Sequence, residues 1–169
     1  MTYPVHTQKR IILGIDPGLT ISGFAIMSGT GSKQVIQECG YISFESTKAM
    51  REKIKEFYDF LHKKIDLCQI GEIAIETPFL GKNSASFLKL GYLRSIVYLV
   101  CEQRDISLHE FAPRTIKQAI TGYGNAEKEQ VNRAIKLVFP QLAQLDIKKY
   151  DVTDAVSIAL CGLWNQRKI

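Results

Sequence analysis

Three short apolar runs follow one another near the N-terminus, and tight turns separate them. The runs are RIILGID at 10–16, SGFAIMS at 22–28 and QVIQECGYISF at 34–44. Their β-branched and aromatic residues are typical of strands, whereas Pro17, Gly18, Gly29 and Gly31 between them are typical of turns. Because strands joined by such short turns pair side by side in opposite directions, this feature predicts an antiparallel meander.

The hydrophobic period then changes from two residues to three or four. Met50, Ile54, Phe57, Leu61 and Ile65 form the apolar stripe of a helix over 47–66. The strand-like GEIAIE at 71–76, a long helix over 83–104 and the strand-like ISLHEF at 106–111 follow. Strands alternating with helices pair in parallel through right-handed crossovers.

The rest of the chain is expected to be helical, over 114–120, 127–139 and 152–163, and the last helix has a face of small residues that suits close packing on a sheet. The prediction is an α/β protein with a five-stranded mixed sheet, three antiparallel strands followed by two parallel ones, flanked by helices. That order is the one a ribonuclease H-like fold requires. We expect one domain over residues 1–169, with a polar N-terminal arm at 1–9.

Composition narrows the possible functions. No apolar run approaches the length of a membrane helix, and the N-terminus lacks the pattern of a secretory signal, so a cytoplasmic location is expected. The four cysteines and three histidines follow no spacing typical of zinc sites, and buried free thiols are the simple explanation of the cysteines. A bound metal would therefore need carboxylate ligands, which favours Mg²⁺ or Mn²⁺.

The chain has a formal net charge of +5, which suits a polyanionic partner such as nucleic acid. Basic residues gather shortly before the last acidic pair of the chain: Arg114, Lys117, Lys128, Arg133, Lys136, Lys148 and Lys149. The ordinary alternative for each is a solvated helix face. The stretch GYGNAEKEQ at 122–130 adds glycines and Asn125, a candidate helix N-cap, which together could form a phosphate clamp.

Two acidic residues end strands that the topology places side by side in parallel, Asp16 and Glu76. Each has an ordinary explanation, since acids are common in the turns that follow strands. Asp151 and Asp154 stand three residues apart at the start of the last helix, where an N-cap or a favourable interaction with the helix dipole would also explain them.

Taken together, the four acids can converge if the last helix packs on the sheet. Four carboxylates at one point would repel one another unless cations neutralise them. Two divalent ions about 4 Å apart can activate water and hold a scissile phosphate. The set therefore predicts a metal-dependent nuclease with Asp16, Glu76, Asp151 and Asp154 as metal-binding catalytic acids.

Three long segments carry a specific resemblance. They are GIDPGLTISGFAIM, IAIETPFLGKNSASFLKLGYLRS, and HEFAPRTIKQAITGYGNAEKEQV leading to YDVTDAVSIAL. From about residue 11 to 163 the chain resembles RuvC-type crossover junction endodeoxyribonucleases, the bacterial Holliday junction resolvases. The resemblance implies Mg²⁺-dependent cleavage of four-way DNA junctions in recombination and repair, with two ions per site for which Mn²⁺ may substitute.

The resemblance also implies site residues and partners. Lys117 and Lys128 match basic residues that contact DNA, Phe79 matches an aromatic that stacks on bases, and Arg114 and Asn83 are further candidates for DNA contacts. Core packing is the alternative for Phe79. The family acts as a homodimer together with the RuvA and RuvB proteins, and the apolar helix over 83–104 suits such an interface, or else is simply a core helix. Phe87 and Ser95 depart from the small residues usual in the family, and many relatives have histidine at the position of Gly162.

Two other functions remain open. The sequence DPGLT resembles a phosphate loop of actin- and hexokinase-type ATPases, which need two such domains, whereas this chain has one copy. The chain could also be a module that binds branched DNA without cutting it. Retention of all four acids favours the enzyme.

Overall fold

Five strands form one mixed sheet in the computed structural model, which describes residues 9–30, 33–78, 84–144 and 150–165, so most of the predicted N-terminal arm lies outside it. The strands are β1 (Arg10–Asp16), β2 (Ile21–Thr30), β3 (Lys33–Ser43), β4 (Glu72–Glu76) and β5 (Ser107–Phe111). Their order in the sheet is β3-β2-β1-β4-β5. The first three are antiparallel, and β1, β4 and β5 are parallel, which confirms the predicted fold class.

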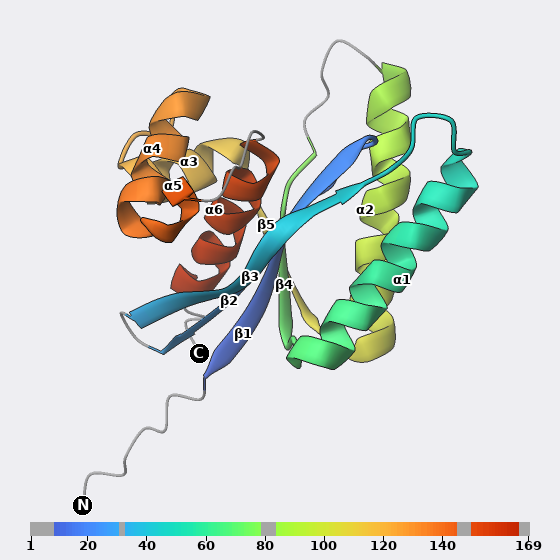
Figure 1. Cartoon of the computed structure of the whole chain (residues 1–169), viewed down its shortest axis with the longest axis horizontal. Coiled ribbons are helices and arrows are strands. Elements are labelled where there is room, and N and C mark those ends of the chain that lie inside the picture. Colours follow the sequence, from blue (N-terminus) through green and yellow to red (C-terminus); the bar gives the residue numbers. More distant parts are fainter. Residues whose placement is uncertain (1–8, 31–32, 79–83, 145–149, 166–169) are drawn as a thin grey trace, which may run out of the picture.

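Helices cover both faces of this sheet (Figure 1). Helices α1 (Met50–Cys68) and α2 (Ser84–Arg104) lie on one face. On the other face lie α3 (Pro113–Thr121), α4 (Lys128–Val138), α5 (Gln141–Gln144) and α6 (Tyr150–Trp164). Of these, only the short α5 is absent from the predicted elements. In the described part of the chain, no helix combines the length and apolar character needed to cross a bilayer.

Alternating side chains of the strands build one core on each face. Leu13 and Ile15 of β1 belong to the core beneath α1 and α2, which includes Phe57 and Leu93. Ile12, one position away, belongs to the core beneath α6. The near-continuous apolar run of β1 is explained by the burial of both faces of the strand. Asp16 is the acid that ends this strand, where the chain leaves the buried core.

Helix α6 packs directly on the sheet, and nearly every residue from Val152 to Leu163 is buried. A Cβ atom at Gly14 would lie 2.3 Å from the carbonyl oxygen of Ala155. A Cβ atom at Gly23 would lie 2.0 Å from the carbonyl oxygen of Asp151. Since real Cβ atoms do not approach backbone so closely, these two glycines allow α6 to touch β1 and β2. The predicted small-residue packing of the last helix is thus confirmed.

We expect Gly14→Ala to lower the free energy of unfolding by about 1–3 kcal/mol, because the methyl group must push the α6 backbone away. Urea denaturation followed by circular dichroism measures this change. The matched control is Gly71→Ala, since a Cβ atom at Gly71 would meet nothing within 4 Å. Equal stability of the two variants would show that α6 can shift at no cost.

The opposite end of α6 is anchored by a partly buried polar network. The Arg10 guanidinium forms two hydrogen bonds of 2.6 Å with the Glu72 carboxylate. It also donates to the carbonyl oxygens of Gly162 and Leu163, at 3.0 and 2.9 Å. His109 contacts the same carboxylate at 2.6 Å. Arg10 therefore joins the last turn of α6 to the starting edge of β1 and β4.

Candidate active site

Asp16 and Glu76 end the two neighbouring parallel strands at the centre of the sheet. Ile15 of β1 pairs with Ile75 of β4, so the next residues, Asp16 and Glu76, emerge level with each other. The turn after Asp16 is held by the buried Ser22, whose hydroxyl accepts from the Gly18 amide at 3.0 Å and donates to the Gly18 carbonyl at 3.1 Å. The pairing of β1 with β4 thus sets the spacing between the two acids.

Asp151 and Asp154 approach this edge from the start of α6, Asp151 in its first turn and Asp154 just after it. The backbone of Asp151 lies against β2, where the absence of a side chain at Gly23 makes room for it. Thr153 reinforces the turn by donating its hydroxyl proton to the Tyr150 carbonyl at 2.9 Å. Because Gly23 pairs with Asp16 in the sheet, the start of α6 lies beside the edge where β1 and β4 end.

The electrostatics of these residues show that they form one cluster. Burial, followed by the charges of Asp154, Glu76 and Asp151, raises the pKa of Asp16 from 3.8 to about 7. Burial and the charge of Asp154 also raise the pKa of Glu76, although Arg94, Lys117 and Lys128 oppose that shift. Burial raises the pKa of Asp154 as well. The charges of Asp154, Glu76 and Asp151 thus all disfavour ionisation of Asp16, which is the situation that bound cations relieve.

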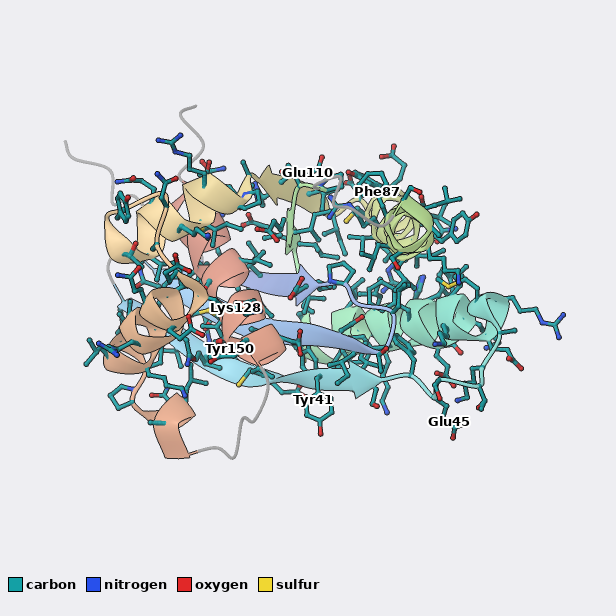
Figure 2. All side chains as sticks on the ribbon, turned by 90° about the horizontal axis from the view of Figure 1, so that it is seen from above. Tyr41, Glu45, Phe87, Glu110, Lys128 and Tyr150 are labelled. Atoms are coloured by element: carbon teal, nitrogen blue, oxygen red, sulfur yellow. The ribbon has the colours of Figure 1, made fainter. Side chains whose placement is uncertain are left out.

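Lys128, the first residue of α4, supplies one positive charge to this cluster. Its ammonium contacts Asp154 Oδ2 at 2.7 Å and lies 5.1 Å from the centre of the Tyr150 ring. Figure 2 shows the Lys128 and Tyr150 side chains near each other beside α6. About half of the Lys128 side chain is exposed, so the ammonium can also reach a ligand in solution.

The donor chemistry fits a hard divalent cation, because the cluster offers carboxylate oxygens and no sulfur or imidazole ligand. Among the described residues, however, no three acidic, histidine or cysteine side chains are arranged as they stand to hold a metal ion. Two effects explain why the side chains stay apart: the carboxylates repel one another, and Asp154 pairs with Lys128. The backbone positions bring the acids together, whereas the side chains are not gathered around one point.

A cavity of about 430 Å³ lies beside the cluster, between the ends of β1 and β4 and one side of α2. Asp16 and Glu76 form one wall, and the α2 wall combines apolar and polar side chains. The lining residues on α2 are Phe87, Leu90, Gly91, Arg94, Ser95 and Tyr98. An acidic edge thus adjoins a hollow large enough for part of a substrate.

The family model of the crossover junction endodeoxyribonuclease RuvC matches residues 12–162 of the chain. The chain belongs to the RuvC family. A RuvC protein of Chlorobium phaeobacteroides is 39% identical over 153 residues, which cover 90% of this chain and 81% of that protein. The resemblance seen in the sequence is therefore confirmed, and it favours the nuclease interpretation over the ATPase one.

Solved RuvC structures agree with the fold. The Thermus thermophilus RuvC structure matches with a TM-score of 0.75 at 21% identity and covers 89% of this chain and 91% of its own. Thermus thermophilus RuvC in complex with a Holliday junction substrate matches with a TM-score of 0.77 at the same identity and coverage. At this identity the match supports the RuvC fold, and the arguments about individual residues rest on the geometry above.

The basic residues expected at a RuvC site differ in how close they lie to the acids. Lys117, on α3, is near enough for its charge to oppose the raised pKa of Glu76. Arg114, at the start of the same helix, is exposed and lies along the buried Gly124, where a Cβ atom would come within 2.7 Å of the arginine Cγ. Phe79, Asn83, Lys148 and Lys149 lie outside the described residues.

The expectation that Asn125 caps the following helix is wrong. The N-cap of α4 is Glu127, whose amide donates to the Gln130 side chain at 2.7 Å. Asn125 instead lies within a turn closed by the Ala126 amide and the Tyr123 carbonyl, at 3.1 Å. Of the glycines of this stretch, Gly122 ends α3 in the left-handed conformation, with φ of 77°. An acidic N-cap makes this helix start less suited to a phosphate than expected.

The sequence interpretation also missed one residue, Arg94. It lies on α2, is only 8% exposed and contributes to both the cavity wall and the electrostatics of Glu76. A charged residue inside the apolar stretch LGYLRSIVYLV was the available signal, since buried cations are rare unless they have partners.

Proposed function

We propose that this chain is a Mg²⁺-dependent endonuclease that resolves four-way DNA junctions by paired hydrolysis of phosphodiester bonds during recombination and repair. The observation that carries the proposal is that Glu76, Asp151 and Asp154 all lie near enough to Asp16 to raise its pKa, in a RuvC-family chain. Because no nucleophilic side chain is needed when ions activate water, a cluster made of carboxylates is sufficient for hydrolysis.

The four carboxylates would hold two Mg²⁺ ions, for which Mn²⁺ could substitute. The bound ions would activate water and neutralise charge on the scissile phosphate. Asp16 and Glu76 keep fixed positions because both end buried strands of the sheet. Asp151 and Asp154 are positioned by the backbone contact of α6 with β2. Lys128 and Lys117 supply positive charge on the α3 and α4 side, where a phosphate could be bound.

The proposed DNA surface extends from these lysines. Arg114 is exposed close to Lys117, on the same helix, and is placed to contact the DNA backbone. Phe79 and Asn83, between β4 and α2, are proposed to contact the junction, with the Phe79 ring stacking on a base. Stacking on an aromatic ring offsets part of the cost of opening a base step.

Two incisions in a two-fold symmetric junction require two sites, so we propose that the chain acts as a homodimer. Helix α2 supports this, because Leu88, Tyr92 and Leu99 are 43–59% exposed on it. Association through α2 would place the two acid clusters in a fixed relation. We further propose that the dimer works in the cytoplasm and with RuvA and RuvB, as the family resemblance implies.

A cleavage assay tests the function directly. Labelled four-way, Y-shaped and duplex DNA are incubated with the protein, with Mg²⁺ or with EDTA, and the products are sized on a denaturing gel. We expect paired incisions in the four-way junction only when Mg²⁺ is present. Binding without incision in any metal would instead identify a module that recognises branched DNA.

We expect Lys117→Ala to weaken junction binding and to reduce the slope of log K against log salt by about one unit, because one phosphate contact is lost. Fluorescence anisotropy with labelled junction at several salt concentrations measures this slope. Lys55→Ala is the matched control, since this exposed lysine lies on α1 and pairs with Asp59. An unchanged slope in Lys117→Ala would place that residue away from DNA.

A further inference from the structure

Arg94 is a buried cation at the edge of the acid cluster. Its side chain is 10% exposed, on the face of α2 that meets the ends of β4 and β5. Burying a guanidinium is costly unless its N–H groups and its charge find partners. The identity of these partners therefore indicates why the residue is there.

The partners of Arg94 lie at the ends of two neighbouring strands, Glu76 on β4 and Glu110 on β5. One terminal nitrogen donates to the backbone carbonyl oxygen of Glu76, the residue that carries a proposed catalytic acid. The other donates to Glu110 Oε1 at 3.1 Å. The Tyr98 hydroxyl, one helical turn further along α2, donates to the same Glu110 oxygen. Figure 2 shows Glu110 at the end of β5 on the side where α2 lies.

These contacts fix the point where β4 stops. The strand ends at Glu76, and beyond it the Thr77 amide donates to the Phe111 carbonyl at 2.8 Å. Without Arg94, the carbonyl of Glu76 would lose a charged donor at the position where the carboxylate must be held. The guanidinium also places a permanent positive charge near Glu76, and its attraction acts against the repulsion from Asp154.

Lysine could not reproduce this arrangement. The two partners of Arg94 lie in different directions, and the planar guanidinium reaches both with separate nitrogens. An ammonium has one charged centre at the end of a flexible stem and cannot hold two directed contacts with the same rigidity. Arginine at this position is thus explained by geometry as well as by charge.

We propose that Arg94, braced by Glu110 and Tyr98, is a positioning residue that holds Glu76 in place for metal binding. This proposal rests on the proposed function of the acid cluster. Groups that orient metal ligands from behind are worth about 10- to 100-fold in metal affinity or activity. The competing explanation is that Arg94 only fastens α2 to the sheet.

A set of variants separates the two explanations. Arg94→Met removes the charge and both contacts, and Arg94→Lys keeps the charge without the paired contacts. Arg104→Met is the matched control, since Arg104 lies on the same helix and pairs with Asp66 away from the cluster. Thermal melting confirms folding, Mn²⁺ titration by isothermal calorimetry gives metal affinity, and junction cleavage over a range of Mg²⁺ gives its half-saturating concentration and kcat.

For Arg94→Met we expect the Mn²⁺ dissociation constant and the half-saturating Mg²⁺ concentration to rise about 10- to 100-fold. We expect junction binding in EDTA to be unchanged, Arg94→Lys to be intermediate, and Arg104→Met to bind Mn²⁺ like the wild type. Wild-type Mn²⁺ affinity in folded Arg94→Met would overturn the proposal. If Arg94→Met does not fold, wild-type Mn²⁺ affinity in Arg94→Lys would likewise overturn the proposal.

A wild type that binds Mn²⁺ but cleaves no junction would contradict the proposed function alone, and the calorimetry would still test the role of Arg94.

Discussion

Asp16→Asn is expected to cleave a four-way junction at least about a thousandfold more slowly than the wild type, which corresponds to about 4 kcal/mol of activation free energy. The amide removes one charged ligand from the cluster. The raised pKa of Asp16 reflects its interaction with all three other acids. Junction binding should be retained, because Asp16 contributes no contact that attracts phosphate. Single-turnover cleavage and anisotropy measure the two properties separately.

Asp59→Asn is the control for this experiment. Asp59 is an exposed acid of α1 that pairs with Lys55, and it lies on the other face of the sheet from α6. We expect it to cleave and bind like the wild type. If Asp16→Asn cut the junction at the wild-type rate, the assignment of the active site to this edge would be wrong.

The metal-free wild type should lose stability as the pH rises from 5 to 8. The pKa of Asp16 is about 7 in the folded protein, against an ordinary value of 3.8, so the folded state holds this proton more tightly than the unfolded state. The resulting stabilisation is complete below about pH 4 and is lost as the pH rises through 7. Between pH 5 and 8 the loss from Asp16 amounts to about 3 kcal/mol. The raised pKa values of Glu76 and Asp154 act in the same direction.

Urea denaturation in EDTA at several pH values measures this effect. Asp16→Asn cannot ionise at this position, so its stability should fall less with pH and exceed that of the wild type at pH 8. Adding Mg²⁺ should restore the wild type at pH 8, since a ligand that binds only the folded state stabilises it. Parallel pH dependences for the wild type and Asp16→Asn would contradict the electrostatic description of the cluster.

The positions of Asp16 and Glu76 could be predicted from sequence because they depend on local patterns and one topological rule. Apolar runs located the ends of both strands, and parallel pairing brought those ends together. The approach of α6 could be predicted in the same way from Ala155, Ala159 and Gly162. Such residues have few other uses on a helix that faces a sheet. The role of Gly14 and Gly23 in this approach, in contrast, was not recognised from the sequence.

Interactions between segments far apart in the chain were harder to predict from the sequence. Lys128 could be identified as basic, but its contact with Asp154 depends on how α4 packs beside α6. Arg94 could be recognised as unusual in an apolar helix, but its partner Glu110 lies on another element of the fold. The error at Asn125 has a different origin. A residue favoured at helix starts also fits turns, and only the actual backbone path distinguishes the two.

Gly14 and Asp16 lie on the same strand but are constrained by different properties, Gly14 by stability and Asp16 by activity. A neutral residue at Asp16 would lower the cleavage rate and raise the stability of the metal-free protein. If cleavage were no longer under selection, substitution of this acid by a neutral residue would therefore be tolerated. At Gly14 no such exchange exists, because a larger residue would weaken the fold and push away the α6 backbone at Ala155, the residue that follows Asp154. A descendant that abandoned catalysis would therefore be expected to lose Asp16 long before it lost Gly14.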